Sequence, residues 1–166
     1  MSTAAAQSRT EARWLSEDQQ HVWRRMLPVL HELPAALDRQ LQVDAGIPHA
    51  YYVILAMLSE APDRELRMTE LSGITATSLS RLSHAVARLE EYGWVERRRC
   101  PTDRRGQLAR LTDAGWDKVV ELAPGHVGAV QRFVFEALTP EQVTQLGVIA
   151  DAITAAIAQD ERRPGT

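Results

Sequence analysis

The stretch from residue 78 to residue 112 changes its hydrophobic period partway along, and this change constrains the fold more than any other feature of the chain. Its first part is helical, because four apolar residues recur at steps of three and four and therefore share one face: Leu79, Leu82, Val86 and Leu89. Gly93 follows the last of them, where a helix often ends in a left-handed residue. The pattern therefore predicts a helix that ends just before Gly93.

Beyond Gly93 the period is two. Residues 94–98 and 107–111 alternate as short strands do, and the segment between them contains Pro101 and Gly106, which are typical of a turn. A polar helix followed directly by a basic hairpin is suited to duplex DNA. The helix fits the major groove, and the hairpin can reach the neighbouring minor groove or the phosphates.

The distribution of charge supports this interpretation, although the whole chain is acidic. The net charge is −3, yet between Arg81 and Leu111 there are eight arginines and four acidic residues, a local charge of +4. A basic surface on an acidic body can still orient a molecule toward phosphates. The competing interpretation is a solvated hairpin without a partner. It is disfavoured because the charges gather where groove contact requires them.

A long helix is expected before this stretch. Ser16 and Gln19 form a capping box, and an apolar stripe continues from there to about residue 44. Pro28 and Pro34 interrupt the stripe, and each removes an amide donor from the helix. We therefore expect either a kinked helix or two helical pieces in line.

Shorter elements lie between the long helix and the central stretch. A second helix is expected after Pro48, residues 66–68 are expected to add a third strand, and Thr69 is expected to cap a small helix over residues 70–73. This order places a helix-turn-helix in front of the hairpin.

Two helices are expected after the hairpin. Thr112 caps the first, which should reach about residue 137 and bend at Pro124. Thr139 and Gln142 form a capping box for the second. The fold class is therefore predicted to be mainly α (α+β).

Several motifs in this order resemble the MarR family, bacterial transcription regulators related to the multiple-antibiotic-resistance repressor. They are R-L-E-x-x-G-x-V at residues 88–95, D-x-R at residues 103–105 and L-T-x-A-G at residues 111–115. The resemblance covers about residues 17–158 and implies a winged helix-turn-helix between N- and C-terminal dimerisation helices. The implied layout is a disordered tail at 1–15, one domain at 16–158 with its winged lobe at about 48–112 and dimerisation helices at 16–46 and 113–158, and a second tail at 159–166.

The resemblance implies a ligand-responsive repressor that binds a pseudo-palindromic double-stranded DNA operator as a homodimer. Helical phase places Arg81, His84 and Arg88 on the exposed face of the helix, while His84 departs from the basic residue usual in the family. Arg105 and Arg104 compete as the residue that enters the minor groove, and this choice stays open. The predicted DNA-binding residues are Ser78, Ser80, Arg81, Ser83, His84, Arg88, Arg98, Asp103, Arg104 and Arg105.

Two further sets of residues follow from the same resemblance. A small aromatic or anionic effector would bind near Trp23, Met26, His49 and Tyr52, for which an ordinary place in the core is the competing interpretation. The predicted dimerisation residues are Leu30, Leu37, Val143, Leu146, Ile153 and Ile157.

Other classes of function find little support. No apolar run is long enough to cross a membrane and no secretory signal is present, which favours the cytoplasm and the nucleoid. Cys100, the single cysteine, follows three arginines that would favour a thiolate, but an ordinary hairpin role competes with a redox role. The histidines have no metal-ligand spacing and catalytic motifs are absent, so we expect no metal, no cofactor and no enzyme. The main rival is a winged-helix module for protein–protein assembly.

Overall fold

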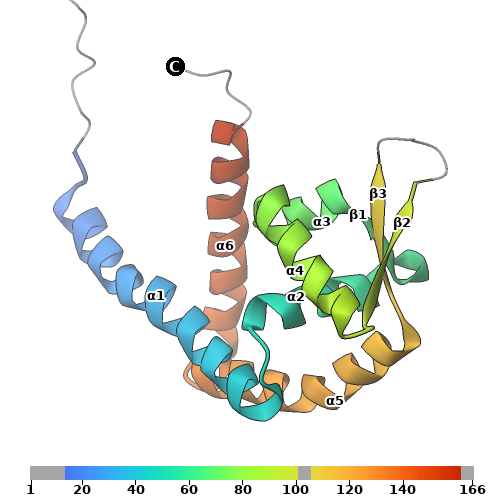
Figure 1. Cartoon of the computed structure of the whole chain (residues 1–166). Coiled ribbons are helices and arrows are strands. Elements are labelled where there is room, and N and C mark those ends of the chain that lie inside the picture. The colour runs from blue at the N-terminus through green and yellow to red at the C-terminus, as the bar shows by residue number, and fades with distance from the viewer. Residues whose placement is uncertain (1–13, 101–105, 162–166) are drawn as a thin grey trace, which may run out of the picture. The chain divides into compact units, whose positions relative to one another are not determined.

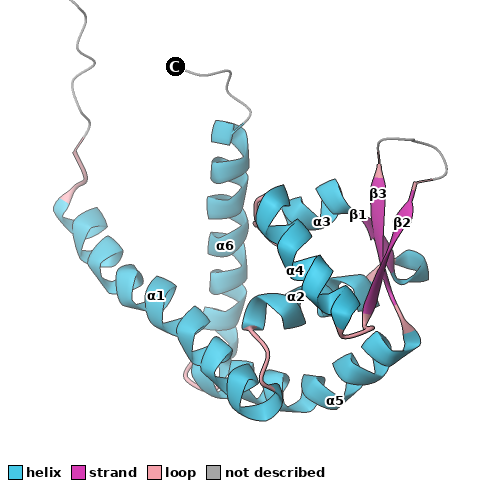
Figure 2. Ribbon diagram, viewed as in Figure 1, coloured by secondary structure: helices cyan, strands magenta, loops and turns pink. Residues whose placement is uncertain are grey.

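The computed structural model describes residues 14–100 and 106–161, which are mostly helical (Figure 1). The three strands form one small sheet (Figure 2), and the predicted mainly α fold class is confirmed. The chain divides into two units, residues 1–34 and 35–166. The elements, in chain order, are α1 (Glu17–Ala45), α2 (His49–Glu60), the 3-10 turn η1 (Pro62–Arg64), β1 (Glu65–Arg67), α3 (Met68–Ile74), α4 (Leu79–Glu91), β2 (Val95–Arg99), β3 (Gln107–Leu111), α5 (Asp113–Val130), the π-helical turn η2 (Gln131–Phe135) and α6 (Pro140–Glu161).

The start of α1 is the predicted capping box. The amide of Ser16 donates to Oε1 of Gln19 at 3.0 Å, and the amide of Gln19 donates to Oγ of Ser16 at 3.2 Å. Pro28 and Pro34 both lie inside α1, which is one helix from Glu17 to Ala45. The prolines therefore do not divide it into two helices.

The sheet is antiparallel and has the strand order β1-β3-β2. Its register pairs Glu65 with Arg110 and Val95 with Leu111. Because β3 is central, it joins the hairpin formed by β2 and β3 to β1, which lies much earlier in the chain. The predicted third strand is confirmed, although it spans residues 65–67 instead of 66–68.

The core of the second unit lies where α2, α3 and α4 meet the inner face of the sheet. Each element contributes side chains with no or almost no exposed area, including Leu55, Leu58, Leu71, Leu82, Val86, Leu89 and Ala109. Burial of this kind stabilises a fold by about 25 cal/mol for each Å² of apolar surface removed from water. The core thereby fixes α4 against the sheet.

The start of α3 differs from the prediction. The helix begins at Met68, its N-cap residue is Arg67, and no side chain caps it, so Thr69 is not the cap. Met68 is itself buried. Apolar packing of the first helical residue, which a search for capping residues does not detect, therefore accounts for the earlier start.

The helices after the sheet also end differently from the prediction. The α-helical part of α5 stops at Val130 and continues as η2 to Phe135, whereas one helix to about residue 137 was expected. Pro124 lies inside α5. The last helix has the predicted capping box, with the amide of Thr139 donating to Oε1 of Gln142 at 2.9 Å, and it runs to Glu161.

Candidate nucleic-acid interface

The helix α4 has a buried face and a polar exposed face. Ser78 caps it, accepting a hydrogen bond on Oγ from the amide of Arg81 at 3.4 Å. Leu82, Val86 and Leu89 are completely buried, as their spacing predicted. The opposite face exposes Ser80, Arg81, His84 and Arg88. The helix therefore presents a row of hydrogen-bond donors and acceptors to solvent.

The end of α4 is a Schellman motif. The amide of Gly93 donates to the carbonyl of Glu90 at 2.9 Å, and the amide of Trp94 donates to the carbonyl of Leu89 at 3.0 Å. Gly93 has a φ of +73°, a conformation that suits glycine. This turn leads the chain directly from α4 into β2, so the hairpin lies beside the helix (Figure 1).

Two residues of α4 do not lie where the helical pattern placed them. Leu79, the first residue of the helix, is 47% exposed. Ser83 is half-buried, and its Oγ accepts a hydrogen bond from Nη1 of Arg97 at 3.4 Å. Ser83 therefore contacts the hairpin, whereas Ser80, Arg81 and His84 are exposed.

Arg88 remains on the exposed face but has an ionic partner. Its Nη1 lies 2.5 Å from Oε2 of Glu91, one turn along the helix. This hydrogen bond raises the pKa of Arg88. Since both side chains are well exposed, the pair leaves Arg88 accessible, while the carboxylate of Glu91 offsets its positive charge.

The described part of the hairpin presents its arginines in different directions. Arg98 is about half exposed, and carboxylate oxygens of Glu65 and Glu96 each lie 3.8 Å from its guanidinium. Arg97 points instead toward α4, where it is paired with Glu90. The predicted residues Asp103, Arg104 and Arg105 lie outside the described residues.

Cys100 is buried, which differs from the accessible position that a redox sensor requires. Its amide donates to the carbonyl of Gly106 at 2.9 Å, closing the hairpin at the ends of β2 and β3. The observed position agrees with the ordinary hairpin role.

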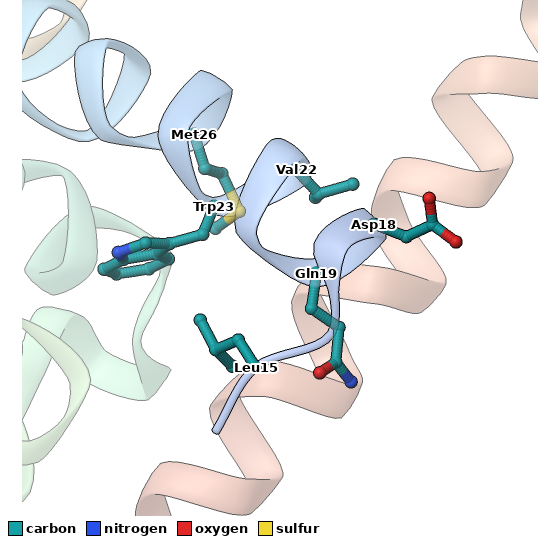
Figure 3. A pocket seen from close by; sticks show the side chains of 6 residues that line it. All are labelled: Leu15, Asp18, Gln19, Val22, Trp23 and Met26. Atoms are coloured by element: carbon teal, nitrogen blue, oxygen red, sulfur yellow. The ribbon is translucent and has the colours of Figure 1, made fainter.

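The residues predicted to bind an effector belong to two separate groups. Trp23 and Met26, in the first unit, line a shallow and mainly apolar pocket together with Leu15 and Val22 (Figure 3). His49 and Tyr52 belong to the second unit, where Tyr52 is buried in the core. That burial raises the pKa of the Tyr52 hydroxyl.

His126 of α5 joins the second group, and no spacing rule pointed to it. Its ring stacks on that of His49 with the centroids 5.3 Å apart and lies 4.5 Å from the ring of Tyr52. Burial lowers the pKa of both histidines, the proximity of His49 lowers that of His126 further, and the negative charge of Asp38 partly opposes the effect at His49. The pair is therefore predominantly neutral near neutral pH.

Most residues predicted for dimerisation are exposed. Leu30 of α1 and Leu146, Ile153 and Ile157 of α6 all carry exposed apolar surface, and Val143 is half-buried. Leu37 differs, because only 8% of its surface is exposed within the single chain. Its part of α1 belongs to the second unit, so little of its side chain remains available to a partner.

Neither a metal site nor a membrane-spanning helix is found within the part of the chain that the structure describes. No group of three or more histidine, cysteine or acidic side chains could hold a metal ion there. No helix in that part is long and apolar enough to cross a membrane.

The fold and this surface define the class of winged helix-turn-helix proteins, in which a helix-turn-helix precedes a β-hairpin. A family model described as "MarR family" matches residues 45–106. The structure of Sco3205, a MarR family transcriptional regulator from Streptomyces coelicolor solved in complex with DNA, is similar to this chain at 51% identity. It matches 87% of this chain and 94% of its own, with a TM-score of 0.83. The chain belongs to the MarR family of transcriptional regulators.

Two further relatives of this chain are also transcriptional regulators. AbsC, another MarR family regulator from Streptomyces coelicolor, is 36% identical, with 89% of this chain and 99% of that chain covered and a TM-score of 0.83. The transcriptional repressor MprA of Escherichia coli K12 is 26% identical over 117 residues, which is 70% of this chain. That alignment spans 66% of the length of MprA.

Proposed function

We propose that this protein binds a pseudo-palindromic DNA operator as a homodimer and represses transcription from it. The observation that carries the proposal is the exposed face of α4. Ser80, Arg81 and His84 lie there on a helix whose other face buries Leu82, Val86 and Leu89 completely, so the helix can enter a groove without exposing these core residues. We expect the protein to act in the cytoplasm, at the nucleoid.

The two parts of the surface have different roles in this proposal. Arginine can donate two hydrogen bonds to a guanine edge in the major groove, which favours Arg81 for reading sequence. The hairpin, with Arg98 exposed on it, is suited to phosphates and to the minor groove, where Arg104 and Arg105 remain the competing insertion residues. That Sco3205 was solved in complex with DNA supports this arrangement by similarity.

A second copy of the chain accounts for the apolar surface of α6. Leu146, Ile153 and Ile157 are 41%, 39% and 58% exposed, which is unfavourable in water unless a partner covers them. Two copies related by a two-fold axis would present their α4 helices to successive major grooves, about 34 Å apart. A pseudo-palindromic operator follows from this symmetry.

The proposal includes a small aromatic or anionic effector that releases the operator. The pocket beside Trp23 and Met26 is mainly apolar, although Asp18 and Gln19 also line it, and it includes an indole ring, so it favours an aromatic ligand. His49 and Tyr52 are the other candidates. An operator-release assay with aromatic carboxylates tests this part, and Trp23→Ala should abolish the release if the pocket binds them.

The experiment for the main proposal is sequencing of the genomic fragments that the purified protein retains, followed by footprinting. We expect the retained fragments to share an inverted repeat that is protected over about two turns of DNA, with binding that weakens steeply as salt rises. The double variant Arg81→Ala, His84→Ala serves as the control and should retain far fewer fragments. Fragments without a common sequence, or binding that is indifferent to salt, would instead favour a protein-assembly module.

A further inference from the structure

Arg97 lies on the inner face of the hairpin and is half-buried, the least exposed of the three consecutive arginines. It pairs across the sheet with Ala109, which is completely buried, and so its side chain lies on the same face as the core. Arg98 and Arg99 are exposed. The side chain of Arg97 is directed to the last turn of α4.

The partner of Arg97 is Glu90, and both oxygens of its carboxylate are used. Nε of Arg97 donates to Oε2 of Glu90 at 2.7 Å, Nη2 lies 2.5 Å from the same oxygen, and the backbone amide of Arg97 donates to Oε1 at 2.9 Å. Each side chain is 29% exposed. Charge-assisted hydrogen bonds of this kind, in a partly buried place, are about twice as strong as neutral ones.

The bond to the backbone amide makes this contact more than an ion pair between side chains. In the order β1-β3-β2, the strand β2 is at the edge of the sheet, and its amide at Arg97 points away from β3 toward Glu90. Glu90 therefore joins the main chain of β2 to α4, that is, the β2–β3 hairpin, or wing, to the proposed recognition helix. Ser83, two helical turns earlier in α4, adds a contact to Nη1 of Arg97 at 3.4 Å.

We propose that Glu90 is a positioning residue for DNA binding, which holds the wing at a fixed angle to α4 through Arg97. This inference rests on the proposed function. In this proposal Arg97 does not contact DNA. The wing is oriented to bind DNA only while the hydrogen bonds between Arg97 and Glu90 are intact.

Glu90→Gln distinguishes a positioning role from a purely electrostatic effect, because the two predict opposite changes in operator affinity. Removing a negative charge near DNA should tighten binding if charge alone matters. If Glu90 positions the wing, operator affinity should instead fall about tenfold, which is the effect of losing about one charge-assisted bond. Glu91→Gln is the matched control, since Glu91 is the next residue of α4, carries the same charge and pairs only with the exposed Arg88 among the ion pairs of the described chain.

The first readout is hydroxyl-radical footprinting on the strongest fragment retained by the wild-type protein. Glu90→Gln should lose protection at the flanks, where the wing binds, and keep the protection given by α4. Its salt slope should fall by about one for each phosphate that the wing no longer neutralises. Glu91→Gln should retain the wild-type footprint. If the wild-type protein retains no DNA fragment, the proposed function is wrong. If Glu90→Gln has the same affinity and footprint as Glu91→Gln, only the positioning role is overturned.

The second readout needs no DNA. Hydrogen exchange of the free Glu90→Gln variant should accelerate in β2, at the amide of Arg97 above all, while the amides of α2 stay protected as in the wild type. Faster exchange throughout the second unit would mean that the substitution weakens the whole fold, and this result would overturn the inference, as would unchanged exchange in β2.

Discussion

Arg81 stands in the first turn of α4, at the end of a recognition helix that commonly meets base edges first. Its amide is engaged by the cap residue Ser78, so the backbone there is fixed while the guanidinium is exposed. We predict that Arg81→Ala costs about 1–3 kcal/mol of binding free energy per half-site and relaxes the preference at particular base pairs. Titration of the variant against a set of operator mutants measures this. Equal weakening on every sequence would show that Arg81 contacts phosphate.

Helical spacing in the sequence identifies the exposed row of α4 but not the contacts that cross between elements. Helical phase identified Arg81, His84 and Arg88, because phase depends on local spacing alone. Glu90 and Arg97 are joined across a turn, and His49 and His126 are brought together by the packing of α2 against α5. Strand alternation separates Arg97 from Arg98 and places it on the face of Val95, but no local pattern indicates Glu90 as its partner, since Glu90 belongs to another element.

At the scale of elements, the junction between β2 and α5 depends on a close approach at Gly115. A β-carbon at this position would lie 2.1 Å from the carbonyl oxygen of Trp94 and 2.7 Å from Cδ1 of Leu111. We predict that Gly115→Ala destabilises the fold by about 1–3 kcal/mol, because backbone and core must both shift. Urea unfolding followed by circular dichroism measures the change.

Gly128 provides the control for this substitution. It lies in the same helix, α5, and an added β-carbon there would meet nothing within 4 Å. Gly128→Ala should therefore be neutral or stabilise the protein by about 0.5–1 kcal/mol, as is usual for a glycine replaced inside a helix. Equal destabilisation by both substitutions would contradict the role given to the contact at Trp94.

The capping boxes show which element boundaries a sequence can reveal. Ser16 with Gln19 and Thr139 with Gln142 make the expected reciprocal bonds, because a capping box is complete within four consecutive residues. The sequence pattern does not locate the start of α3, because burial of Met68 fixes it. It does not locate the end of α5 either, because η2 replaces the last turns of that helix. Burial of the kind that fixes Met68 depends on residues far from the boundary in the chain.

At the scale of the whole molecule, we predict that the protein is a homodimer held in part by α6. Light scattering at micromolar concentration should give about twice the chain mass of 18.5 kDa. Ile153→Asp should shift the population toward the monomer, because it would bury an unpaired charge in the interface. Gln145→Asp adds the same charge to an already polar, exposed position of α6 and should leave the dimer intact. A wild-type monomer would contradict the prediction.

Stability should also depend on pH through His49 and His126. Since burial lowers their pKa values in the folded protein below the ordinary value of 6.5, the unfolded chain binds protons more readily. The free energy of unfolding should therefore be highest above pH 6.5, and decrease as pH falls from there toward the lowered pKa values. Thermal melts between neutral and mildly acidic pH measure the slope. His126→Gln should flatten it, and an unchanged slope in that variant would assign the effect elsewhere.

The pairing of β1 with β3 has a consequence for how the protein is made. Glu65 can find its partner Arg110 only after the ribosome has released everything between them, including the whole of α4. Chains synthesised from the N-terminus therefore hold β1 as an unpaired edge until β3 emerges, and closing such a distant contact is slow compared with forming a helix. A nascent chain arrested before residue 107 can contain α4, but it lacks the strand that would bind β1 to the hairpin. The helix that we propose to read DNA is therefore held against a complete sheet only after residue 111 has been synthesised.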